Sequence, residues 1–110
     1  MLTHLNKYKE IKKLWKLQLK DTFPHESAGI EIDGLDLVLC DTYAAGCIET
    51  YVLRKGRLDD ERVKYLVGCQ EVLSKAVETL KDDSVVYFDR LLKIVNEILV
   101  DLELQRNNKF

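Results

Sequence analysis

The residues best suited to acid–base chemistry are two carboxylates in the stretch 36–54. Asp41 and Glu49 are eight residues apart with Ala45 midway, so a helix would place all three on one side. Two carboxylates beneath one cleft can act as general acid and general base, and His25 in the preceding loop could approach them. A polar strip on a helix is more often solvated or salt-bridged than catalytic. We therefore treat Asp41, Glu49 and His25 as weak catalytic candidates and lean against an enzyme.

Three cysteines are the residues that could bind a metal or act as nucleophiles. Their number is odd and each stands among apolar neighbours, which predicts free, buried thiols: Cys40, Cys47 and Cys69. No two of them have the two-to-four-residue spacing of a zinc site, and neither H-E-x-x-H nor E-x-x-H occurs. The glycines match no phosphate-binding loop. The sequence therefore predicts no metal and no cofactor.

Lysines gather on one side of the first segment, opposite the apolar side of a helix over 3–20: Lys9, Lys12, Lys13, Lys16 and Lys20. Such a face could contact phosphates or an acidic lipid surface, with Trp15 as an interface anchor. Against this, Trp15 falls on the side that the core needs, and residues 21–53 offer seven acids without a Lys or Arg as internal counter-charge. The pI near 5.7 also disfavours a nucleic-acid partner. We expect a solvated or internally neutralised face and keep anion binding as an alternative.

The elements that must carry these residues are mostly helices. Apolar residues recur at helical spacing over 3–20, 59–81 and 84–104, and the acidic start of the third segment suits a helix N-terminus. Because only a few residues link the last two segments, these two helices should pack as an antiparallel hairpin.

The stretch 36–54 permits two interpretations. As a strand it would place Asp41 on an otherwise apolar face, whereas as a helix it has a wide apolar arc and a narrow polar strip. Its length favours the helix, and with it an all-α bundle of about four helices. The small residues Ala44, Ala45, Gly46 and Cys47 then predict a close crossing of a neighbouring helix, and the alternative is a space left for a ligand.

Residues 21–35 are predicted to be irregular. Pro24 pushes Phe23 out of helical geometry, and the glycines add further breaks. Asp33-Gly34 between two apolar residues is the dipeptide of a tight turn, so a short β-hairpin is the alternative.

The totals fit a small globular protein. With 110 residues, 46% hydrophobic and 33% charged, the chain suits a single helical domain over 1–110. No run approaches the roughly 18 to 20 apolar residues that span a bilayer, and no signal-peptide stretch is present, so we expect no transmembrane segment and a cytoplasmic location.

The leading functional hypothesis is an interaction or regulatory module, with pairing as a homodimer. It rests on the missing catalytic motifs and on apolar residues of the last helix that extend beyond one seam: Val85, Val86, Tyr87, Ile94, Val100 and Leu104. The alternatives are an anion-contacting module that uses the lysines of the first helix and an enzyme built on Asp41 and Glu49.

Overall fold

The computed structural model describes residues 2–107, and the side chains of residues 4–107. It confirms the all-α fold. The four helices are α1 (Leu2–Lys20), α2 (Leu37–Leu53), α3 (Asp60–Thr79) and α4 (Ser84–Asn107). Between α1 and α2 lie a 3₁₀ turn, η1 (His25–Ser27), and two short strands, β1 (Glu31–Ile32) and β2 (Leu35–Asp36).

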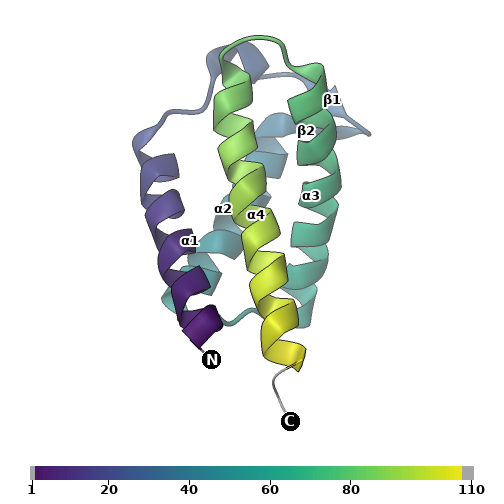
Figure 1. Cartoon of the computed structure of the whole chain (residues 1–110). Coiled ribbons are helices and arrows are strands. Elements are labelled where there is room, and N and C mark those ends of the chain that lie inside the picture. The colour runs from purple at the N-terminus through teal and green to yellow at the C-terminus, as the bar shows by residue number, and fades with distance from the viewer. Residues whose placement is uncertain (1, 108–110) are drawn as a thin grey trace.

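The helices form an up-down-up-down bundle, in which the start of α1 and the end of α4 lie at the same end (Figure 1). Helix α4 lies between α1 and α3 and packs most extensively on these two, while α2 packs mainly on α3. Helices α3 and α4 form the antiparallel hairpin that the short link predicts. Within residues 2–107, no helix is long and apolar enough to cross a membrane.

The short hairpin confirms the alternative for residues 21–35. Ile32 pairs with Leu35, and the two turn residues between them both have positive φ, 54° at Asp33 and 81° at Gly34. This is the backbone of the tight turn that Asp-Gly favours. The strand carries directly into α2, because the Asp36 carboxylate accepts a hydrogen bond from the Val38 backbone N–H at 2.7 Å and caps the helix.

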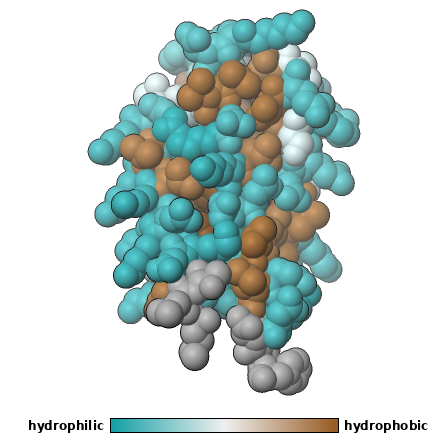
Figure 2. Space-filling model, viewed as in Figure 1, coloured by the Kyte–Doolittle hydropathy of each residue, from teal (hydrophilic) through white to brown (hydrophobic). Residues whose placement is uncertain are grey.

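The core holds the apolar side of every helix, including Trp15 of α1, as the helical spacing predicts. It also accounts for much of the apolar excess of α4. Ile94 is fully buried, and Val85, Tyr87 and Leu104 are partly buried, so only Val86 and Val100 of that set are exposed. Most of these α4 side chains are therefore covered within the monomer, which leaves only two of them for a dimer interface. Figure 2 agrees, since hydrophilic side chains separate the apolar areas on the face that it shows.

Candidate functional site

The two carboxylates of α2 are held by different partners. Asp41 is half-buried and accepts a hydrogen bond from the Tyr87 hydroxyl at 2.7 Å, while Glu49 is exposed and accepts one from Trp15 Nε1 at 3.3 Å. Burial raises the pKa of Asp41, and the bond from Tyr87 opposes that rise. Eight residues of helix separate the two acids by about 12 Å along its axis. The structure therefore does not bring Asp41 and Glu49 together as a reacting pair.

His25 lies in η1 and is exposed. It lines a pocket of about 440 Å³ between the loop after α1 and the start of α4, and Tyr87 lines the same pocket. Neither Asp41 nor Glu49 contributes to that lining. The pocket thus contains one of the three catalytic candidates and reaches a second only through the Tyr87 hydroxyl.

The lysines of α1 remain on the surface. Lys9, Lys13, Lys16 and Lys20 are exposed, and Lys12 lies over the Tyr8 ring, 5.5 Å from its centroid. Within residues 4–107, none of these five makes an ion pair with an acid.

Five of the seven acids of residues 21–53 have other partners. Asp21 pairs with Arg90 of α4, and Asp33 pairs with Lys75 of α3. Asp36, Asp41 and Glu49 are engaged as described above. In the described part of the chain, therefore, no acid of this segment forms an ion pair with the lysines of α1 that it was expected to neutralise.

All three cysteines are free and buried, as predicted. The hydrogen bond with Cys69 and burial raise the pKa of the Cys40 thiol, and burial raises that of Cys47. The same hydrogen bond lowers the pKa of the Cys69 thiol. The Cys40 and Cys47 thiols are therefore poor nucleophiles at neutral pH. In the described part of the chain, no group of three or more His, Cys, Asp or Glu side chains is arranged to bind a metal ion.

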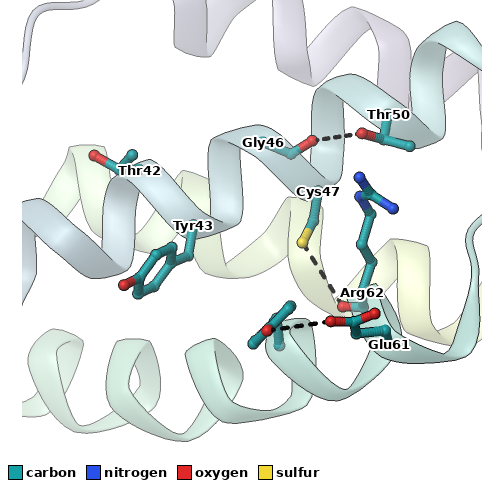
Figure 3. A pocket seen from close by; sticks show the side chains of 8 residues that line it. Thr42, Tyr43, Gly46, Cys47, Thr50, Glu61 and Arg62 are labelled. Carbon is teal, nitrogen blue, oxygen red and sulfur yellow. Dashed lines mark hydrogen bonds between the residues drawn. The ribbon is translucent and has the colours of Figure 1, made fainter.

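The most distinctive surface is a groove between α2 and α3 with a volume of about 420 Å³. The α2 wall supplies Thr42, Tyr43, Gly46, Cys47 and Thr50, and the α3 wall supplies Glu61, Arg62 and Tyr65. Figure 3 shows Cys47 pointing from α2 toward α3 and the Arg62 side chain rising toward α2. The Arg62 guanidinium is also hydrogen-bonded to Asp59 at 2.7 Å, and that bond lowers the pKa of Asp59.

Two tyrosines stack at the mouth of the groove. The rings of Tyr43 and Tyr65 have centroids 6.3 Å apart and an interplanar angle of 22°. Despite this contact their exposed fractions are 50% and 54%. Each ring therefore keeps about half of its surface available to a binding partner.

Gly46 faces this groove, so the prediction of a close helix crossing at that residue is wrong. A Cβ added at Gly46 would meet no atom within 4 Å beyond its own helical backbone. Ala44 and Cys47 on either side are buried, and Ala45 is partly buried. The helical wheel groups these small residues together, but Gly46 lies on the exposed side of α2, where no neighbouring helix comes within 4 Å of an added Cβ.

A short repeat, overlooked in the sequence patterns above, underlies the groove. The pattern Tyr-x-x-Gly-Cys occurs as residues 43–47 in α2 and as residues 65–69 in α3. The two copies have matching environments, because in each the Tyr is exposed, the Gly is exposed with no neighbour within 4 Å of an added Cβ, and the Cys is buried.

The repeats are also related by an approximate two-fold axis between the antiparallel helices. The Cys47 thiol donates to the Arg62 carbonyl at 3.7 Å, and the Cys69 thiol donates to the Cys40 carbonyl at 3.8 Å. Arg62 and Cys40 each stand three residues before the Tyr of their own copy, so the two contacts are equivalent. The α2–α3 face means Tyr43, Gly46, Tyr65, Gly68 and the groove between α2 and α3. Its Tyr and Gly positions are therefore related by near two-fold symmetry, while the groove itself lies on the Gly46 side of the tyrosine pair.

A second polar cluster, also unexpected from the sequence, lies at the end of the bundle where α1 begins and α4 ends. The Asp101 carboxylate of α4 is completely buried, and it accepts hydrogen bonds from Tyr51 of α2, from His4 of α1 at 2.7 Å and from Gln105 at 3.1 Å. Gln105 also donates to the Gly56 carbonyl at 2.7 Å. We call His4, Tyr51, Gly56, Asp101 and Gln105 the Asp101 network. Because each polar side chain in it has a partner, we assign it a structural role.

Compared with protein-family models, with curated proteins and with solved structures, the chain matches none of them. The candidate site therefore rests on its own geometry.

Proposed function

We propose that this protein is a small interaction module that pairs with a second copy of itself through the α2–α3 face. The observation that carries the proposal is the pair of exposed glycines in the middle of helices. A helix-interior glycine costs about 1 kcal/mol relative to alanine. Neither Gly46 nor Gly68 is required by a close neighbour or by a positive φ. The loss of helix stability at both glycines is explained if a partner must approach the helix backbone there.

The side chains around the glycines suit a protein partner. Tyrosine is among the residues that contribute most to binding energy at interfaces, because its ring buries a large area and its hydroxyl still forms a hydrogen bond. Tyr43 and Tyr65 are half-exposed and are already ordered by their mutual stacking. Little conformational entropy would be lost when a partner covers them.

A second copy is the occupant that fits best. In a two-fold dimer the same patch meets itself, so each large side chain needs a hollow in the identical surface opposite. The α2–α3 face has this property, since each helix carries an exposed Tyr and, one turn later, an exposed Gly. The groove also holds one charge of each sign, Glu61 and Arg62, which a two-fold axis can bring into opposition.

The location that we propose for this module is the cytoplasm. Three free thiols are typical of a reducing compartment.

The test is the molar mass measured by light scattering and sedimentation over a concentration series. We expect the natural chain to change from monomer to dimer, and the double variant Tyr43→Ser/Tyr65→Ser to weaken pairing about thirtyfold or more. The matched control is Val86→Ser/Val100→Ser, which removes two exposed apolar side chains from α4 and should leave the dissociation constant unchanged. A monomer at every concentration, or equal weakening by the control, would contradict the proposal.

A further inference from the structure

The exposed side of α1 combines cations with large apolar side chains. Lys9, Lys13, Lys16 and Lys20 fall within an arc of about 60° at 100° per residue. Leu5 and Leu19 lie along one edge of this arc and Leu17 along the other, with exposed fractions of 53%, 61% and 50%. We call these seven residues the Lys-Leu face. It is separate from the α2–α3 face, because none of its seven residues belongs to that face or lines its groove.

The charge on this face is not neutralised within the described part of the chain. None of its four lysines makes an ion pair, although Lys7, on the inner side of the same helix, pairs with Glu97. The one acid on α1 is Glu10, which lies beside Leu17 at the edge of the face. A chain with a net charge of −2 thus carries a local concentration of positive charge.

We propose that the Lys-Leu face binds the surface of a bilayer that contains anionic phospholipids. Lysine ammonium groups would contact the lipid phosphates and carboxylates, while the leucines would enter the boundary between headgroups and acyl chains. The stems of the lysines are apolar, so they can lie along the same boundary with their charges in water.

The composition of the face favours lipid over nucleic acid. Base stacking and phosphate recognition in nucleic-acid sites commonly use aromatic side chains and arginine, and the seven residues include neither. Three leucines exposed among lysines would gain nothing from a duplex, but they would lose contact with water at a membrane. Trp15, which a deeper insertion would use, is buried and donates its indole N–H to Glu49, so the contact is shallow.

The experiment measures how much of the full-length chain sediments with vesicles of phosphatidylcholine alone and of phosphatidylcholine mixed with phosphatidylserine. We expect binding to the mixed vesicles, weakening as salt is added, and little binding to the neutral ones. Lysines near an acidic bilayer each change affinity about fivefold. Because the effects of four lysines multiply, the variant Lys9→Gln/Lys13→Gln/Lys16→Gln/Lys20→Gln should bind several-hundred-fold more weakly.

Two further variants separate this face from the total charge of the molecule. The matched control neutralises four exposed cations elsewhere, Lys64→Gln/Lys81→Gln/Lys93→Gln/Arg106→Gln, and should keep most of the affinity. Leu17→Ser/Leu19→Ser keeps every charge and should still weaken binding about tenfold by removing the apolar contribution.

Equal loss in the control, no effect of the leucine variant, or equal binding to neutral vesicles would overturn the proposal. So would no binding to any vesicle, and so would salt-dependent binding to a DNA duplex that the leucine variant leaves unchanged. Because these variants leave the α2–α3 face intact, their outcome is independent of whether the protein forms a dimer.

Discussion

The Asp101 network and the α2–α3 face contain similar residues in opposite environments. Both contain tyrosine and glycine between helices. In the network, the Tyr51 hydroxyl is buried against Asp101, and Gly56 is pressed against His4. On the face, Tyr43 and Tyr65 are half-exposed, and the glycines have nothing against them.

The residues of the Asp101 network stabilise the monomer, whereas the exposed residues of the α2–α3 face contribute little to its stability. Every polar side chain of the network has a partner inside the chain, so removing one leaves others unsatisfied. On the face, uncovered apolar ring surface contributes no stabilisation by burial, and glycine in the helix interiors lowers the stability of the monomer. Sites kept at a cost in stability are where function is expected.

The largest effect should follow from removing the centre of the network. Asp101→Ala leaves the buried Tyr51 hydroxyl without its acceptor, which costs about 1 to 3 kcal/mol, and it also removes the hydrogen bonds from the partly exposed His4 and from Gln105. We expect the free energy of unfolding, measured with urea at neutral pH, to fall by about 3 kcal/mol or more. Asp89→Ala changes an exposed acid on the same helix and should alter it by less than about 0.5 kcal/mol. If the two variants were equally stable, the network would not carry the role assigned to it.

A smaller loss is expected from Gly56→Ala at the same end of the bundle. Gly56 has φ of +96°, and an added Cβ would lie 2.8 Å from His4 Cε1. Backbone strain and this contact together should lower the free energy of unfolding by about 1 to 3 kcal/mol in the same urea assay. Gly29→Ala is the matched control, because its φ of +86° is similar and an added Cβ meets nothing within 4 Å. A loss no greater than that of the control would show that the His4 contact contributes nothing.

Helical periodicity predicted most of the fold but little of the candidate site. Four amphipathic segments and one Asp-Gly dipeptide define the helices and the hairpin, since both signals are local in sequence. Asp101 was not identified because its partner His4 is 97 residues away and an acid at the end of an amphipathic helix resembles any other. The small residues around Gly46 predict a helix crossing wrongly, because a helical wheel shows which residues share a side but not where the neighbouring helix lies. Comparing α2 with α3 at a spacing of 22 residues would have revealed the repeated Tyr-x-x-Gly-Cys.

Glycine-to-alanine substitution should change the free energy of unfolding in opposite directions on the α2–α3 face and in the Asp101 network. Gly46→Ala places a methyl group where the monomer has free space and improves helix propensity. The free energy of unfolding of the monomer should therefore rise by up to about 1 kcal/mol, where Gly56→Ala lowers it. The same methyl group fills the hollow that a tyrosine of the second copy would occupy, so the dissociation constant of the dimer should increase.

Gly68→Ala is the internal replicate for this prediction, because the repeat gives it the same environment. Both measurements are made on each variant, by urea unfolding at a concentration where the chain is monomeric and by sedimentation across a concentration series. A variant that is more stable and also pairs more weakly separates the two roles of the position. A variant that is more stable and pairs as well as the natural chain would mean that the glycines do not serve the dimer, and one that is less stable would mean that they serve the monomer after all.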